Sequence, residues 1–484
     1  MRKVLIVTAG TIFMNMVCAA QNVGIGTSSP TEKLQVNGNT RTDTIKSNAI
    51  QLAPNAGTGK VLTSDATGNG SWQNSTASNQ GSVGFGGWGD CSVQNISAFN
   101  PVVATDGSAG DIFGRSVAIS GNFAIIGAPG DQNGFFANQG SAYIFFFDGV
   151  NWVQQQKLTA SDGAANDGFG NDVSVSGNFV VVGASKDDNG ANVDQGSVYI
   201  FFYNGTTWNQ VQKIDHLSGG PGDQFGYSVC MKGNSVIIGS PYDDIGGNNA
   251  QGSADVYGYN GTTWVFQDRL TAADGAVTDN FGLDVTVDGI YAFVGAPFDD
   301  VTPNADQGSV HQYFFNGTNW VFQLKITNPN SPTAGDRFGT SVSVSATYCV
   351  IGEPFSGISD QMGAAYVYHY IGFGWFYHQR IQPPSFTTGN GAANSGMSVA
   401  ISGDYFIVVA PAMSENIFSY EGKLFIYRNI SGLWQLHEDF IDPAVGPNEG
   451  NLMNVAIDNN RFAFGAPQAP LNIARGKVVF GKIE

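Results

Sequence analysis

The sequence has few charged residues and is especially poor in basic ones. Asp, Glu, Lys and Arg together make up 12% of the 484 residues, about half the usual share of ~25%. Lys and Arg number 21 against 39 Asp and Glu, which gives a net charge of −18. Nucleic acids and anionic membranes attract clustered Lys and Arg. We therefore expect neither as a partner.

Cysteine is also scarce. The chain has four cysteines, and no two are spaced as C-x-x-C, so neither a disulfide framework nor a zinc motif is predicted. The histidines form no H-E-x-x-H, and no G-x-S-x-G occurs. We expect a protein that is not an enzyme, with no catalytic or cofactor-binding residues. A hydrolase that uses a pair of acids is the least favoured alternative.

Long apolar runs are missing except at the start of the chain. Arg2 and Lys3 precede an apolar stretch over 4–17, and small residues follow up to Ala20. This pattern predicts a secretory signal peptide over 1–20. A membrane anchor is disfavoured because the stretch is shorter than the ~20 residues of a spanning helix. A lipoprotein site at Cys18 is a weaker alternative, since Val17 is large. We expect an exported, extracellular or cell-surface protein without a transmembrane segment in the mature chain.

Glycine and aromatic residues are abundant. Gly accounts for 65 residues, Phe for 34, Tyr for 17 and Trp for 8. Glycine disfavours helices, and aromatic residues favour strands. The composition therefore predicts an all-β protein of many short strands.

Three sequence markers recur with a common period of 56 or 57 residues. Phe-Gly pairs begin at Phe113, Phe169, Phe225, Phe281 and Phe338. Gly-Ala-Pro or a variant of it begins at Gly127, Gly183, Gly239, Gly295, Gly352, Val409 and Gly465. A tryptophan column comprises Trp152, Trp208, Trp264, Trp320, Trp375 and Trp434. Such a period indicates a repeat architecture with seven units.

Each unit reads as four antiparallel strands, which predicts a seven-bladed β-propeller. In the second unit the expected strands are 171–176, 178–184, 196–203 and 208–214. Asn204-Gly205 indicates a type I′ hairpin between the last two. The seventh unit supplies only three strands before Glu484. Residues 94–103 are expected to provide the fourth, with Ile96 in the tryptophan column, and so to close the ring. An open solenoid is the alternative.

The Phe-Gly and Gly-Ala-Pro markers resemble FG-GAP repeats, which form the seven-bladed propeller of integrin alpha subunits. The chain is also similar to exported bacterial proteins that carry only such repeats. The resemblance implies a binding or adhesion role. It weakens in units six and seven, where Ser395-Gly396 and Asn451-Leu452 replace Phe-Gly. The family's D-x-D-x-D-G calcium loops, which join the first two strands of some blades, are absent here, because those turns are tight.

The region before the repeats has a different composition. Residues 21–72 resemble a leader found on fibre-like stalks, which implies a short β-rich segment and a possible trimer. A flexible spacer is the alternative. Residues 73–93 are rich in Gly, Ser and Asn and are interpreted as a linker. The propeller is then expected over 94–484.

Acidic residues gather in the loops between the second and third strands of successive units. Two interpretations remain open for them: turn residues that bond to nearby backbone N–H groups, or Ca²⁺ ligands. The residues are Asp131, Asp187, Asp188, Asp243, Asp244, Asp299 and Asp300.

Two further columns complete the pattern. Basic residues near the ends of the fourth strands are interpreted as protection of exposed sheet edges, and they are Lys157, Lys213, Arg269, Lys325 and Arg380. The tryptophans are expected to pack between blades rather than to stack on sugars. The predicted function is binding or adhesion through the long acidic loops to an extracellular protein or glycan. A lectin-like role is the first alternative.

Overall fold

The computed structural model describes residues 23–25, 34–36, 60–64, 70–74, 96–98, 101–330, 332–356, 362–383, 393–411, 422–440, 454–467 and 476–483. The chain separates into two compact units, Met1–Val93 and Gln94–Glu484. The signal peptide expected over 1–20 lies outside the described residues.

The described residues of the first unit form two small sheets. In one, β1 (Val23–Ile25) and β2 (Leu34–Val36) pair in parallel. In the other, β3 (Lys60–Ser64) and β4 (Gly70–Asn74) form an antiparallel hairpin. β4 ends two residues inside the segment predicted as a linker, and the rest of that segment lies outside the described residues.

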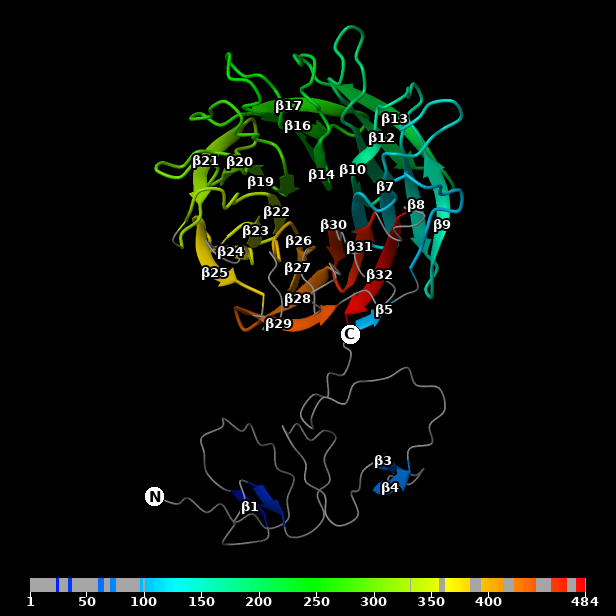
Figure 1. The fold of residues 1–484 in the computed structure, drawn as a ribbon, viewed down its shortest axis with the longest axis vertical. Helices are drawn as coiled ribbons and strands as arrows, with labels where there is room; N and C mark the ends of the chain where they lie inside the picture. Colours follow the sequence, from blue (N-terminus) through cyan, green and yellow to red (C-terminus); the bar gives the residue numbers. More distant parts are fainter. Residues whose placement is uncertain are drawn as a thin grey trace. The chain divides into compact units, whose positions relative to one another are not determined.

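The second unit is a seven-bladed propeller, as the repeats predict (Figure 1). Each blade is a four-stranded antiparallel sheet. The first two blades are β6 (Val117–Ser120), β7 (Phe123–Ala128), β8 (Ser141–Phe147), β9 (Trp152–Leu158), and β10 (Phe169–Ser176), β11 (Phe179–Ala184), β12 (Ser197–Tyr203), β13 (Trp208–Asp215). The next two are β14 (Ser228–Lys232), β15 (Ser235–Ser240), β16 (Ser253–Tyr259), β17 (Trp264–Leu270), and β18 (Val285–Asp288), β19 (Tyr291–Ala296), β20 (Ser309–Phe315), β21 (Trp320–Thr327).

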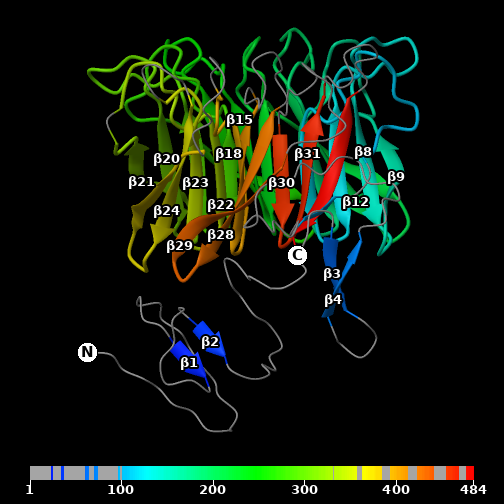
Figure 2. The same ribbon diagram turned by 60° about the horizontal axis from the view of Figure 1, so that its bottom comes forward.

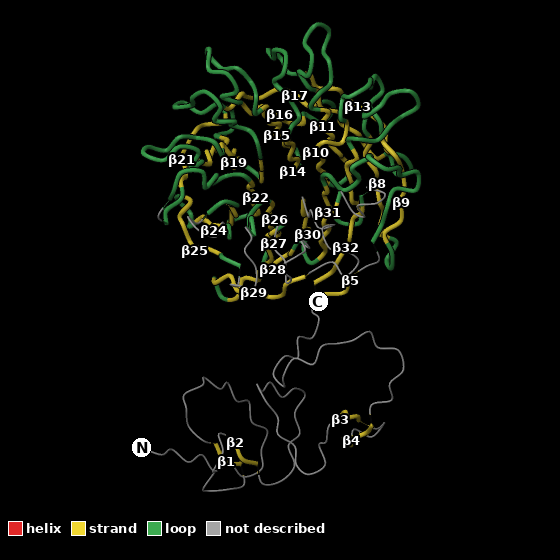
Figure 3. Tube along the Cα trace, viewed as in Figure 1, coloured by secondary structure: helices red, strands yellow, loops and turns green. Residues whose placement is uncertain are grey.

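The last three blades follow the same order. They are β22 (Ser341–Ser345), β23 (Tyr348–Glu353), β24 (Ala364–Tyr370), β25 (Trp375–Ile381); then β26 (Ser398–Ser402), β27 (Tyr405–Ala410), β28 (Lys423–Ile430), β29 (Leu433–Phe440); and β30 (Asn454–Asp458), β31 (Arg461–Ala466), β32 (Lys477–Ile483) with β5 (Ile96–Ala98). First strands surround the centre of the ring, and fourth strands form its rim (Figure 1). No helix occurs in the described residues (Figure 3).

The N-terminal strand closes the ring, as expected from the missing fourth strand of the last unit. β5 pairs antiparallel with β32, and Ile96 lies opposite Ile483. Trp152 lies opposite Phe147 in the same way in the first blade. Ile96 therefore takes the tryptophan position of the seventh blade. The closure joins the two ends of the propeller and leaves no open ring edge.

The hairpins between third and fourth strands differ from the predicted type I′ turns. Tyr203 pairs with Trp208, so the loop has four residues rather than two. Gly205 has a φ of 100°, whereas Asn204 is outside the left-handed region. The Asn204 side chain instead accepts hydrogen bonds from the backbone N–H groups of Thr206 and Thr207. The wider turn is thus held by an asparagine cap.

The hydrophobic core is divided into clusters that lie between neighbouring blades. One cluster joins Ile125 and Ile144 of the first blade to Phe169 and Val182 of the second. Another joins Phe113 of the first blade to Phe480 of the seventh. The tryptophans are buried in these interfaces, as predicted. Trp152, for example, stacks on Phe480 with ring centroids 4.4 Å apart. Each blade is therefore stabilised mainly by its neighbours.

Glycines make the closest contact between blades. A Cβ atom on the first glycine of a Gly-Ala-Pro marker would overlap the carbonyl oxygen of a glycine in the next blade. The pairs are Gly127 and Gly170, Gly183 and Gly226, Gly239 and Gly282, Gly295 and Gly339, Gly352 and Gly396, and Gly465 and Gly114. The second glycine of each pair belongs to the Phe-Gly marker or its variant and has a positive φ. The Gly-Ala-Pro marker of one blade and the Phe-Gly marker of the next therefore form the same contact between blades.

Within the described residues, no helix has the length and apolar character needed to cross a membrane.

We predict that Gly183→Ala destabilises the propeller by about 1–3 kcal/mol, because the new methyl group meets a backbone oxygen that cannot move aside. The urea unfolding midpoint measures the effect. Gly220→Ala is the matched control: Gly220 has no positive φ, and its Cβ would lie 3.8 Å from the nearest atom, Oδ1 of Asp223. The control is expected to be neutral or slightly stabilising. A Gly183→Ala variant as stable as the control would contradict the prediction.

Candidate functional site

The long loops that the structure describes in the propeller lie on one face, which we call the loop face (Figure 2). It consists of the loops that join second to third strands and those that join fourth strands to the next blade. In the first four blades the former are 129–140, 185–196, 241–252 and 297–308. Among the described residues of the propeller, the opposite face carries the short turns that join first to second and third to fourth strands. Loops on a rigid scaffold are where binding sites are usually built.

The first aspartate of each second-to-third-strand loop is buried. Asp131, Asp187, Asp243 and Asp299 are each 4–5% exposed. The backbone carbonyl of each accepts a hydrogen bond from the glycine that ends the loop, such as Gly196 N–H to Asp187 at 2.9 Å. These residues therefore close the base of the loop.

Three of these buried carboxylates are paired with a lysine from the fourth strand. The Nζ–Oδ2 distances are 2.6 Å for Lys157–Asp131, 2.7 Å for Lys213–Asp187 and 2.6 Å for Lys325–Asp299. The same lysines also contact an exposed aspartate, as Lys157 contacts Asp106 at 2.7 Å. These three lysines thus neutralise buried acids on the loop face, a role other than the predicted protection of sheet edges. The pairing was not predicted from the sequence, although the two columns share one period.

The second aspartate of each pair has a different role. Asp188, Asp244 and Asp300 are exposed. Each accepts a hydrogen bond of 2.9 Å from the backbone N–H six residues later, at Asp194, Ala250 and Asp306. Those three residues have φ values of 48–53°. The aspartate thus caps a turn in the left-handed region and fixes the loop tip.

A third set of aspartates lies in the loops that enter each blade, two residues before the Phe of the marker. The side chain of each accepts a hydrogen bond from the backbone N–H three residues earlier. The residues are Asp111, Asp167, Asp223, Asp279 and Asp336. The loop face is therefore acidic and, at the same time, internally bonded.

The seven predicted site residues do not converge on one place. The second, third and fourth blades each hold one buried and one exposed aspartate of this set, and in the first blade Asp131 is followed by Gln132 rather than by a second acid. The hydrogen bonds described above are those of turn residues. Calcium binding at these positions stays a prediction.

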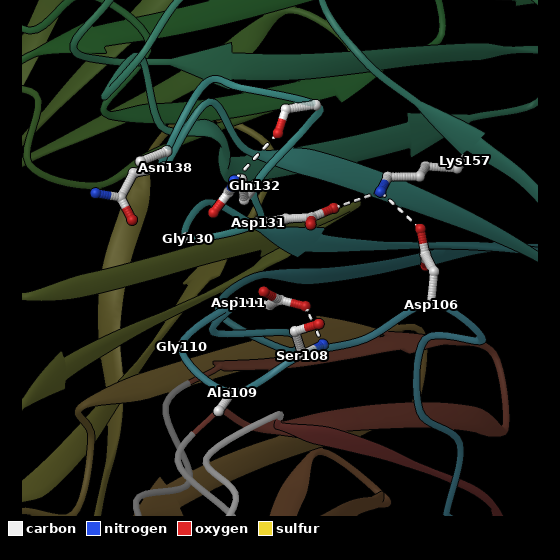
Figure 4. Close-up of a pocket in the computed structure, with 12 residues that line it drawn as sticks. Asp106, Ser108, Ala109, Gly110, Asp111, Gly130, Asp131, Gln132, Asn138 and Lys157 are labelled. Atoms are coloured by element: carbon white, nitrogen blue, oxygen red, sulfur yellow. Dashed lines mark hydrogen bonds and ion pairs between the residues drawn. The ribbon is translucent and has the colours of Figure 1, made fainter.

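A polar pocket of about 480 Å³ opens on the loop face of the first blade (Figure 4). Asp131, Lys157 and Asp106 form one wall, and Asp111 lies opposite with its carboxylate on the Ser108 N–H (Figure 4). A second pocket of about 450 Å³ lies between blades and is lined by Arg115, Lys186 and other residues. Gly130 and Asn138 line both pockets. The two pockets are therefore adjacent, and we call them together the shared groove.

The ion pairs fix the charge states at this pocket. Burial raises the pKa of Asp106, but hydrogen bonds from Lys157 and Tyr143 outweigh it and hold the pKa below its usual value. Burial lowers the pKa of Lys157, but Asp106 and Asp131 hold it above its usual value. Burial raises the pKa of Asp111, and its hydrogen bond from Ser108 opposes that rise. The pocket therefore presents a fixed cation between anions at neutral pH.

The FG-GAP repeat family model matches five stretches of the sequence, which together span about half of it: 100–145, 152–201, 208–257, 264–313 and 320–368. Each of the last four begins at a tryptophan of the column and ends in the third strand of the next blade. No curated protein sequence matches the chain significantly.

We predict that Lys213→Met destabilises the protein by roughly 1–3 kcal/mol, because it leaves the buried Asp187 carboxylate without its cation. Lys213→Met combined with Asp187→Asn is expected to recover part of the loss, which a double-mutant cycle of urea midpoints measures. Lys186→Met, at an exposed neighbouring position, is the control and should be neutral. Equal losses in the single and double variants would argue against the pairing.

Calcium binding is tested by melting metal-free protein with and without added Ca²⁺. If the loop aspartates bind the ion, the midpoint rises, because a ligand of the native state stabilises it. Asp187→Asn with Asp188→Asn should then reduce the rise. An unchanged midpoint in the wild type would leave these residues as turn residues. Lys157, Lys213 and Lys325 already occupy the positions from which a cation would bind Asp131, Asp187 and Asp299.

Proposed function

The chain belongs to the FG-GAP repeat family, and from this we propose that it is an exported binding protein. Its ligand is an extracellular protein or glycan, and the loop face is the binding surface. The protein acts outside the cell or at the cell surface, by binding or adhesion rather than by catalysis.

The observation that carries the proposal is the shared groove. It crosses the first and second blades and reaches Pro467 of the seventh. Carboxylates, amides and basic groups line it, among them Asp111, Gln132, Asn166 and Lys186. Concave sites with convergent polar groups are typical of ligand recognition.

The groove is also preorganised. The buried aspartates close the loop bases, the lysines neutralise them, and side chains link neighbouring loops, as Asn138 Nδ2 donates to Asn166 Oδ1 at 3.1 Å. Loops held in one conformation lose little conformational entropy when they bind. A rigid, polar and acidic face therefore favours recognition of a polar ligand.

Carbohydrate is the second candidate, and one observation favours it. Phe135 is fully exposed and Phe136 is half-exposed. They lie in the loop between Gly134 and Ala137, both of which line the first pocket. An exposed aromatic pair beside hydrogen-bonding groups suits a sugar ring, which presents both an apolar face and hydroxyl groups.

The experiment is a binding screen of the purified chain against a glycan array and a panel of purified extracellular matrix proteins. For any ligand found, Gln132→Ala with Lys186→Glu should weaken binding by about tenfold or more, equivalent to ~1.4 kcal/mol. Asn178→Ala is the control, since it changes an exposed turn on the opposite face.

The variants also separate the two candidates. A glycan whose binding falls in Phe135→Ala supports the lectin-like role, whereas a protein ligand unaffected by that change supports the first. Binding that survives every loop-face change but falls in Asn178→Ala would place the ligand on the opposite face and overturn the proposal.

A further inference from the structure

A buried histidine lies among carboxylates where the second and third blades meet. His216 follows β13, and its side chain has no exposed surface. Its ring stacks on Phe225, with centroids 5.1 Å apart and planes at 15°. Asp223 and Asp243 are 3% and 4% exposed. Nδ1 lies 3.4 Å from Asp223 Oδ2, and Nε2 lies 3.7 Å from Asp243 Oδ2.

Neither ring nitrogen has a hydrogen-bond partner. A buried, unpaired polar group costs free energy, so such groups in native proteins usually have a partner. One ligand atom each from His216, Asp223 and Asp243 lies within 4.8 Å of the other two. The imidazole is thus directed into a pair of buried acids without bonding to either.

This histidine departs from the repeat. The equivalent positions one or two periods of 56 residues away are Ala104, Ala160 and Ala272, all buried, and Asn328, which donates a hydrogen bond to Glu353 Oε1. The scaffold needs only a methyl group at this place in the three blades that have alanine. The imidazole at this position is therefore related to other residues in which the third blade differs from the repeat.

Two further departures change the charges around the histidine. Asp255 stands where the first two blades have Tyr143 and Tyr199, and Ser218 stands where they have Asp106 and Asp162. Arg269 takes the place of the lysine and forms a bidentate ion pair with Asp255. The Nε–Oδ1 distance is 2.8 Å and the Nη2–Oδ2 distance is 3.1 Å.

Because Arg269 is turned toward Asp255, Asp243 loses its close cation. The Arg269 Nη1–Asp243 Oδ2 distance is 3.8 Å. In the first, second and fourth blades, which we call the sister blades, the corresponding lysine lies 2.6–2.7 Å from its buried aspartate. Asp243 Oδ2 accepts a hydrogen bond from Ser253 Oγ at 2.6 Å, and Asp223 Oδ2 accepts one from the Gly220 N–H. The imidazole of His216 lies beside both buried acids.

We propose that His216, Asp223 and Asp243 bind a divalent transition-metal ion such as Zn²⁺. One imidazole nitrogen and one oxygen from each carboxylate form a three-ligand set of the kind zinc takes, with a fourth position for water or a ligand group. Zinc bonds of about 2.1 Å place tetrahedral ligand atoms ~3.4 Å apart, so small rotations of the carboxylates complete the site. The imidazole favours such an ion over Ca²⁺, which prefers six to eight oxygens.

The site has a structural consequence for the loop face. Its ligands come from the loop that enters the third blade and from the loop between β15 and β16. A bound ion ties these two loops together in place of the lysine bridge used by the sister blades. The inference is separate from the proposed function, because it concerns an ion and not the extracellular ligand.

The test uses the untagged full-length chain, freed of metal and titrated with Zn²⁺ by calorimetry and with Co²⁺ by visible absorption. We expect one ion per chain at this site, a higher melting midpoint with Zn²⁺, and the intense absorption of tetrahedral Co²⁺. His216→Ala should weaken binding by at least about tenfold and abolish that absorption. This variant restores the alanine of the sister blades, so its fold is expected to persist, and melting without metal checks this.

Control variants identify the ligands. Asp223→Asn should weaken binding, whereas Asp167→Asn, the equivalent change in the second blade, should leave it unchanged. His369 and His378 lie on another blade with ring centroids 5.7 Å apart, so His369→Ala measures any contribution from that pair.

Three results would overturn the proposal. The first is a wild-type chain that neither binds Zn²⁺ nor shows the Co²⁺ absorption, in which case His216 serves only as a packing or ion-pairing residue. The second is binding that His216→Ala leaves unchanged. The third is binding that only His369→Ala removes.

Discussion

The propeller depends on a backbone contact between blades that only glycine permits. Where Gly183 approaches the carbonyl oxygen of Gly226, and at the five equivalent junctions described, there is no room for a Cβ atom. The close approach lets the buried phenylalanine of each Phe-Gly marker fill the interface beside it. Repeating this contact at a constant spacing sets how neighbouring blades pack, except at the sixth blade, where Val409 takes the glycine position.

The loop face is the product of the same repetition. The first, second and fourth blades each place a buried aspartate at the loop base and a lysine on the fourth strand, so the same pair recurs in three blades. A repeat of this kind makes a rigid surface but gives each blade the same chemistry. Chemistry that differs between blades appears where the repeat changes, as in the cluster of His216, Asp243 and Asp255.

Much of the fold could be predicted from the sequence, because the markers recur at one spacing and strands alternate with turn residues. The seven blades, the buried tryptophans and the closing strand at Ile96 are confirmed. The hairpin type was wrong, since Asn204-Gly205 lies in a four-residue loop whose geometry depends on side-chain caps. Which cation pairs with a loop aspartate depends on distances in the folded chain, and the spacing of residues along the sequence does not give those distances.

The sequence by itself determined the periodic features of this protein, since period, strand order and marker residues are local and repeat along the chain. Only the tertiary structure decided which charges meet. Lys213 lies on β13 and Asp187 lies 26 positions earlier in the loop after β11, and their pairing follows from how the strands of the blade bring these two segments together. The sequence showed His216 as one histidine among five, and the folded chain placed it between two buried acids. Side-chain contacts of this kind arise from the packing of loops across blades, which no local pattern encodes.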